Sequence, residues 1–103
     1  MNGSASPTRT VQGRCVFVPN PCTTQPCLPG MAHALLADDG ELWFITRGGQ
    51  WSDQPPRVGA RTLHVGERLV LTGEASERSD AFGRPYRLIE AASVERAGTG
   101  LTR

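Results

Sequence analysis

Four residues in the first third of the chain carry side chains that could bind a metal ion: Cys15, Cys22, Cys27 and His33. Zinc takes four cysteine or histidine ligands, so this set has suitable chemistry. Structural zinc sites usually contain two cysteines separated by only two residues, and the chain has no such pair. A metal site built from these four residues is therefore an alternative that the spacing does not favour, and we predict no cofactor.

The same cysteines could instead form a disulfide, although three cysteines cannot all pair within one chain. Cys22 and Cys27 share one proline-rich segment, whereas Cys15 lies in an expected strand, where a buried thiol behaves as a small apolar side chain. The spacing favours a Cys22–Cys27 disulfide over free thiols, and free thiols over a metal site. The compartment stays open: the disulfide would indicate an extracytoplasmic protein, and its absence a cytoplasmic one.

Aromatic side chains accompanied by arginines form a second group with possible binding chemistry. Such residues hold single-stranded nucleic acid, because rings stack on bases. The aromatic residues are Trp43, Phe44, Trp51, Phe82 and Tyr86, and the arginines are Arg47, Arg57, Arg61, Arg84 and Arg87. One of the adjacent residues Trp43 and Phe44 must point into the core of a strand-based domain, and Phe44 is the favoured one. Trp51, in a polar segment, is the better candidate for exposure, or else it covers one end of the fold.

The charge of the chain weakens the nucleic-acid interpretation. All eleven basic residues are arginines, and residues 10–96 contain nine of them against ten acidic residues, a net charge of −1. Proteins that bind nucleic acid without sequence preference usually carry a clear basic excess, since contacts to phosphates supply most of their affinity. Single-stranded nucleic acid is therefore a possible but disfavoured partner.

No catalytic motif is evident in the sequence. The two histidines, His33 and His64, are 31 residues apart, and the chain lacks a nucleophile elbow, a phosphate-binding loop and a zinc-protease motif. A pair such as Cys27 and His33 has no third group to orient it. We therefore expect a protein that is not an enzyme.

Short stretches of alternating apolar residues predict an all-β domain over residues 10–96. The expected strands are residues 10–18, 31–37, 41–46, 68–75 and 86–95. Asp39–Gly40 predicts a tight hairpin turn between the second and third strands. Residues 1–9 are expected to be a disordered leader and residues 97–103 a flexible tail. No apolar run is long enough to span a membrane, so no membrane association is expected.

A proline- and cysteine-rich segment, residues 19–30, separates the first two expected strands. Its four prolines exclude a helix or a central strand, so it should form a loop. A second long connection covers residues 47–67 and contains no helical pattern longer than one turn. The expected architecture is a five-stranded closed barrel, because closure removes the unpaired edges of a small sheet.

The chain resembles the oligonucleotide/oligosaccharide-binding (OB) fold, and in particular small stand-alone bacterial OB proteins. Four pieces carry the resemblance: Val11–Gly13, Asp39–Gly40, Val65–Glu74 and Tyr86–Glu95. The Pro/Cys-rich segment and the low number of basic residues depart from the family's usual pattern.

The resemblance implies a ligand face on the second and third strands, with rims at residues 19–30 and 77–84. The implied ligand-binding residues are His33, Leu35, Trp43, Ile45, Trp51, Arg84 and Tyr86. We therefore expect a non-catalytic binding module that holds a protein partner or a small ligand through this face and the Pro/Cys-rich segment. Single-stranded nucleic-acid binding and Cys/His metal binding are the alternatives. The protein is expected to be a monomer or a weak homodimer.

Overall fold

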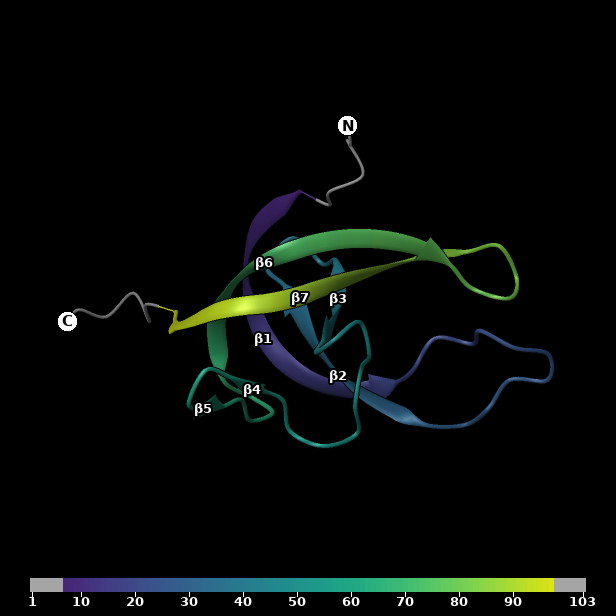
Figure 1. Ribbon diagram of the computed structural model, residues 1–103, viewed down its shortest axis with the longest axis horizontal. Helices are drawn as coiled ribbons and strands as arrows, with labels where there is room; N and C mark the ends of the chain where they lie inside the picture. The colour runs from purple at the N-terminus through teal and green to yellow at the C-terminus, as the bar shows by residue number, and fades with distance from the viewer. Residues whose placement is uncertain (1–6, 98–103) are drawn as a thin grey trace.

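Five β-strands form a ring in the computed structural model, which describes residues 7–97 (Figure 1). The ring strands are β1 (Thr8–Pro19), β2 (Met31–Ala37), β3 (Leu42–Thr46), β6 (Arg68–Ser79) and β7 (Pro85–Arg96), and the two-residue strands β4 (Arg57–Val58) and β5 (Arg61–Thr62) pair only with each other. The described residues contain no helix, and hence none that could cross a membrane. The expectation of an all-β fold with five principal strands is confirmed.

The strands follow the order β1-β2-β3-β7-β6, and pairing of β6 with β1 completes the ring. All neighbours are antiparallel except β3 and β7, which run parallel. Strands β6 and β7 are longer than the part of the hairpin that belongs to the ring. The far end of the hairpin therefore projects beyond the other strands (Figure 1). The loop between β1 and β2 projects on the same side.

The boundaries of the domain differ slightly from those expected. Strand β1 begins at Thr8, inside the expected leader, because residues 8–14 pair with β6. At the other end, Ala97 is buried and its N–H donates a hydrogen bond to the Arg68 carbonyl, so the first residue of the expected tail is ordered. The rest of the expected leader and tail, residues 1–6 and 98–103, lies outside the described residues.

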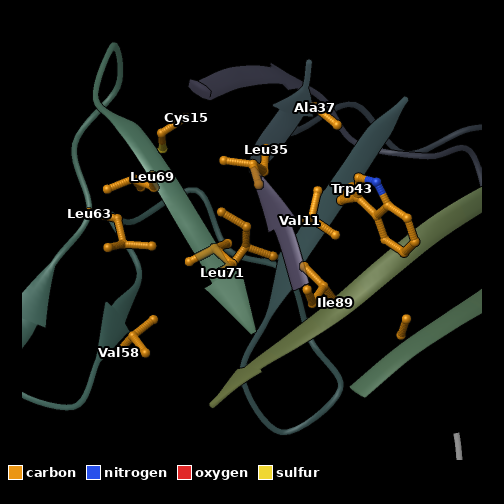
Figure 2. Packing of buried hydrophobic residues seen from close by; sticks show 12 residues of the cluster. Val11, Cys15, Leu35, Ala37, Trp43, Val58, Leu63, Leu69, Leu71 and Ile89 are labelled. Atoms are coloured by element: carbon orange, nitrogen blue, oxygen red, sulfur yellow. The ribbon is translucent and has the colours of Figure 1, made fainter. Parts of the chain in front are cut away.

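The interior of the ring is filled by one half of the alternating side chains (Figure 2). Its principal members are Val11 and Cys15 from β1, Leu35 from β2, Trp43 and Ile45 from β3, Leu69 and Leu71 from β6, and Ile89 from β7. Val58 and Leu63, from the connection that contains β4 and β5, belong to the same cluster and extend it. This long connection thus contributes to the core even though it adds no strand to the ring.

Two glycines allow the backbones of neighbouring strands to approach closely. A Cβ atom on Gly13 would overlap the Leu36 carbonyl oxygen, and one on Gly73 would overlap the Glu90 carbonyl oxygen. The pairing of β1 continues without a register shift through Gly13, so this residue marks a close approach and not a bulge. The bulge lies in β6 between Thr72 and Gly73.

We predict that Gly73→Ala lowers the free energy of unfolding by about 1–3 kcal/mol, because the backbone of β7 must shift to admit the methyl group. Urea unfolding followed by circular dichroism measures this change. Ser93→Ala, at an exposed position of β7, is the control and should change stability by less than about 0.5 kcal/mol. Equal stability of the Gly73→Ala variant and the wild type would contradict the close approach.

Candidate binding face on the outside of the ring

A second apolar cluster lies on the outside of the ring, across β1, β2, β3 and β7. Its buried members are Ala32, Ala34, Phe44 and Leu88, and Val16, Val18, Leu42, Trp51 and Tyr86 pack against them. The register aligns Val16 with Ala34, Ala34 with Phe44, and Phe44 with Leu88, so one apolar row crosses four strands. The outer surface of a small antiparallel sheet is usually polar. This apolar outer face, here called the binding face, is therefore a candidate site of interaction.

Three aromatic rings form the centre of the binding face. The ring centroids of Phe44 and Trp51 lie 6.0 Å apart, those of Phe44 and Tyr86 6.2 Å, and those of Trp51 and Tyr86 6.0 Å. The rings meet at tilted or edge-on angles, which are favourable geometries for aromatic pairs. Phe44 is only 5% exposed, whereas Trp51 and Tyr86 are half-buried. Trp51 and Tyr86 are thus partly accessible to solvent, and both pack against the buried Phe44.

Polar groups border the aromatic centre on the β6 side. The register places Arg78 opposite Tyr86 and Ser76 opposite Leu88. Arg78, Ser76 and Leu88 also line an open cavity of about 370 Å³ on this side of the ring. A ligand on the binding face would therefore meet aromatic and aliphatic surface first, and a guanidinium and a hydroxyl at its border.

The carboxylate of Glu90 fixes the segment that carries Trp51. Glu90 accepts hydrogen bonds from the Thr46 hydroxyl (2.7 Å), the Gly48 N–H (2.7 Å) and the Gly49 N–H (2.9 Å). Partial burial alone would raise the pKa of Glu90, but these hydrogen bonds and the nearby Arg47 outweigh it, so the pKa is lowered. The ionised carboxylate therefore holds the start of residues 47–56 against β7.

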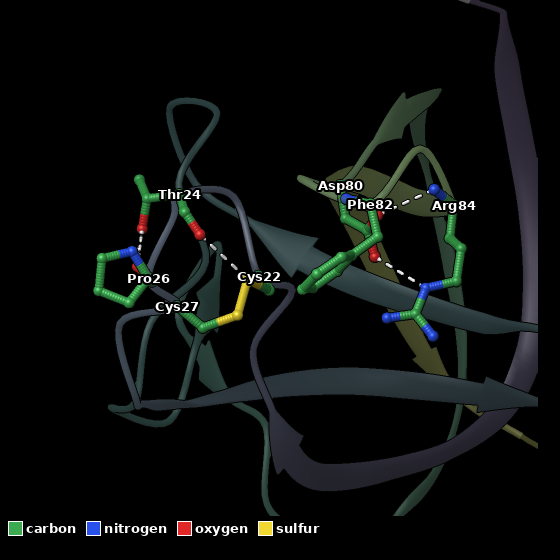
Figure 3. The surroundings of a disulfide bond; sticks show 7 residues. All are labelled: Cys22, Thr24, Pro26, Cys27, Asp80, Phe82 and Arg84. Atoms are coloured by element: carbon green, nitrogen blue, oxygen red, sulfur yellow. Dashed lines mark hydrogen bonds and ion pairs between the residues drawn. A yellow bond between two sulfur atoms is a disulfide. The ribbon is translucent and has the colours of Figure 1, made fainter.

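The two projecting loops at the edge of the binding face contact each other. The Ala81 N–H, in the turn between β6 and β7, donates a 2.7 Å hydrogen bond to the Cys22 carbonyl in the loop of residues 20–30. Within the turn, the Asp80 carboxylate accepts from the N–H groups of Phe82 and Arg84, both at 2.8 Å (Figure 3). Hydrogen bonding to the Arg84 N–H in particular lowers the pKa of Asp80. The turn is thus held in one shape beside the disulfide loop.

Cys22 and Cys27 are joined by a disulfide in this loop, which is the favoured pairing (Figure 3). Cys15 is free and buried in the ring interior, where desolvation and the nearby Glu67 charge raise the pKa of its thiol to about 11. The alternative metal site requires both disulfide cysteines, Cys15 and His33 as ligands. The structure does not bring these four together, and no group of three metal-ligating side chains occurs within residues 7–97.

The structure separates the residues expected on the ligand face into two groups. Leu35, Trp43 and Ile45 are buried members of the interior cluster and do not belong to the apolar cluster on the outside. These three expected residues therefore face the interior side of β2 and β3, whose two alternating halves are both apolar. In contrast, Trp51 and Tyr86 lie together on the binding face.

The two remaining expected residues lie away from the aromatic centre. His33 is 5% exposed and packs against Phe17, with ring centroids 4.8 Å apart. Arg84 lies on the turn, with its guanidinium 5.2 Å from the centre of the exposed Phe82 ring. The expectation omitted Phe44 and Arg78 as site residues. The bulk on both faces of residues 42–46 was the available signal for Phe44, and no sequence signal pairs Arg78 with Tyr86.

No protein-family model and no curated protein matches the chain in sequence comparisons. The binding face is therefore assigned from its own features, namely the apolar row across four strands, the three aromatic rings and the two loops in contact at its edge.

We predict that Glu90→Gln destabilises the protein by about 1–2 kcal/mol near neutral pH, because a neutral amide accepts more weakly than a carboxylate. The lowered pKa means that this stabilisation is present above the usual carboxyl pKa and is lost as the pH falls through the lowered one. The difference between variant and wild type should therefore shrink in acid. Urea unfolding at several pH values measures it, and faster amide exchange of Gly48 and Gly49 is the local check.

We further predict that two of the three cysteines resist alkylation unless a reductant is added. The third, Cys15, should react only after unfolding, because its thiol is buried and its pKa is raised. Mass spectrometry after alkylation counts the labelled thiols. Three labels on unfolded, non-reduced protein would contradict the disulfide, and a Cys15→Ala variant identifies which thiol is labelled.

Proposed function

We propose that this protein is a non-catalytic binding module of the OB type that holds a polypeptide segment of a protein partner on its binding face. The observation that carries the proposal is the cluster of Phe44, Trp51 and Tyr86 on the outside of β3 and β7. Aromatic side chains on a rigid scaffold supply large contact area at small entropic cost, which is why they dominate many protein interfaces.

The arrangement of the strands supports the OB assignment. OB domains are five-stranded Greek-key barrels that bind ligands on the face of their second and third strands, between the loops that join strands one and two and strands four and five. Here the equivalent face is the outside of β2 and β3, and the equivalent loops are residues 20–30 and 80–84. The contact between these loops, through Ala81 and Cys22, frames the binding face at one edge.

Charge and surface chemistry favour a polypeptide over a nucleic acid. Arg84 is paired with Asp80, and Glu74 and Glu90 lie on the same side of the ring as Arg78. Phosphates would meet these carboxylates, whereas the methyl groups of the apolar row fit aliphatic and aromatic side chains. Single-stranded nucleic acid remains the second candidate because Trp51 and Tyr86 are partly exposed aromatic residues on which bases could stack.

The Cys22–Cys27 disulfide supports a protein that works in an oxidising compartment outside the cytoplasm. The proposed partner would then be a secreted or surface-exposed protein. No reductant would break the disulfide in such a compartment, so the loop would keep its shape. The neighbouring turn would then keep its hydrogen bond to Cys22.

We predict that dodecapeptides selected from a random display library will bind the wild type and lose at least about tenfold in affinity with Tyr86→Ala or Trp51→Ala. Loss of one buried aromatic contact of about 2 kcal/mol corresponds to this change. Val65→Ala, which removes an exposed apolar side chain outside the binding face, is the matched control and should bind normally. Peptides that bind all of these variants equally would place the interaction elsewhere.

Tryptophan fluorescence distinguishes the nucleic-acid alternative from peptide binding. A Trp43→Phe variant leaves Trp51 as the one tryptophan, so its emission reports on the binding face alone. Selected peptides should change this emission at micromolar concentration. Strong quenching by an oligothymidylate at low salt, with no response to the peptides, would replace the proposal by single-strand binding.

A further inference from the structure

A separate cavity of about 280 Å³ lies where residues 47–57 fold against the ends of β2 and β3. His33 and Ile45 line it from these strands, and Arg47, Ser52, Pro55 and Arg57 are among the residues that line it from the connection. None of the three rings at the centre of the binding face lines it. It is therefore a second candidate site with its own walls.

His33 is a buried polar residue that lines this cavity. The residue is 5% exposed, and its Nδ1 lies 3.2 Å from the Ser52 carbonyl oxygen. Because a carbonyl can only accept, Nδ1 carries the hydrogen, which leaves Nε2 as the free ring nitrogen. No residue in the described part of the chain forms a hydrogen bond with Nε2. Buried polar atoms are nearly always paired, so this acceptor nitrogen points to a missing hydrogen-bond donor such as a water molecule.

The cavity also contains two positive charges and no carboxylate. Arg57 forms no ion pair with any residue between 7 and 97, and Arg47 is fixed by a hydrogen bond from its guanidinium to the Arg57 carbonyl. Arg47 also contributes to the lowered pKa of Glu90, but Glu90 lies outside the lining and its oxygens already accept hydrogen bonds from the backbone. A ligand that enters this cavity therefore meets two guanidinium groups, of which that of Arg57 has no ion-pair partner within residues 7–97.

Three apolar residues line the cavity beside the polar residues Gln50, Ser52 and Gln54. Ile45, Pro55 and Pro56 face the cavity, so a fully hydrated ion would leave these surfaces without a partner. The volume lies at the lower end of the range of small-molecule sites, which limits a ligand to about one ring or a short chain.

We propose that this cavity binds a small organic carboxylate. Arg57 and Arg47 would hold the carboxylate, since guanidinium groups match its geometry with two parallel hydrogen bonds. Pro55, Pro56 and Ile45 would contact the apolar part of the ligand. This site goes beyond the proposed function, because it needs none of the aromatic rings of the binding face.

Benzoate is the probe, and NMR titration of the histidine ring signals locates its binding. The His33 signals should shift and saturate, whereas those of His64, an exposed residue that does not line the cavity, should remain unchanged. Benzamide has the same ring without the charge, and inorganic phosphate has charge without a ring. Both should bind at least about tenfold more weakly than benzoate, because benzamide lacks the charge that the arginines bind and phosphate lacks the apolar ring.

Three variants test which residues hold the benzoate carboxylate. Arg57→Gln should weaken benzoate binding at least about tenfold, because it removes the guanidinium and keeps the backbone carbonyl that Arg47 contacts. Arg14→Gln removes an exposed arginine that does not line the cavity, and should bind benzoate normally. Tyr86→Ala should also bind benzoate normally, so failure of the binding face and failure of this site are distinguishable.

Four results would overturn the proposal, and three of them concern benzoate itself. These three are the absence of a saturable His33 shift, equal binding of benzoate and benzamide, and undiminished binding by the Arg57→Gln variant. If phosphate bound more tightly than benzoate, the site would be one for a simple inorganic anion and not for an organic carboxylate. Amide spectra of each variant, recorded in the same experiment, establish that it is folded.

Discussion

The position of β3 between two partners is the constraint on which the rest of the structure depends. This five-residue strand pairs antiparallel with β2 and parallel with β7, and so joins the two halves of the ring. Its side chains alternate strictly between the two sides of the sheet. Trp43 and Ile45 fill the interior, while Phe44 and Thr46 face outward. A shift of register by one residue would exchange these sets and remove both the core and the binding face.

Thr46, the last residue of β3, extends this constraint to the connection that follows the strand. Its hydroxyl and the N–H groups of Gly48 and Gly49 converge on one carboxylate, that of Glu90 in the neighbouring strand. A carboxylate can accept several hydrogen bonds at once, and charge-assisted bonds are the stronger kind. The connection therefore leaves β3 in a fixed direction. Trp51 then lies on the binding face, and the next residues close the cavity beside His33.

Local chemistry made part of this fold predictable from the sequence. The alternating apolar residues located all five principal strands, and the proximity of Cys22 and Cys27 in one proline-rich loop favoured their pairing. Each of these features depends on residues close together in the chain. The two-residue strands β4 and β5 were not expected, because they are too short to show a period.

The candidate site was harder to predict because it depends on contacts between distant residues. Trp51 and Tyr86 were both expected at a ligand site, but the ring that supports them, Phe44, was expected in the core. When both alternating halves of a strand are apolar, the sequence contains no sign of which half faces inward. Which half faces inward depends on the side chains that β2 and β3 meet across the interior of the ring, such as Leu71. Glu90 likewise has no local signal, since its partners lie more than 40 residues earlier.

The energy of binding at the proposed binding face depends on which of its aromatic side chains the fold already covers. Trp51 packs against the buried Phe44, and this contact stabilises the free protein while Trp51 and Tyr86 stay partly exposed. A ligand therefore meets rings that the fold already holds in place, so little side-chain entropy is lost on binding. Displacing Trp51 would instead require breaking its contacts with Phe44 and Tyr86 and moving a segment fixed by Glu90. The proposed ligand would therefore bind on top of the aromatic cluster and not beneath it.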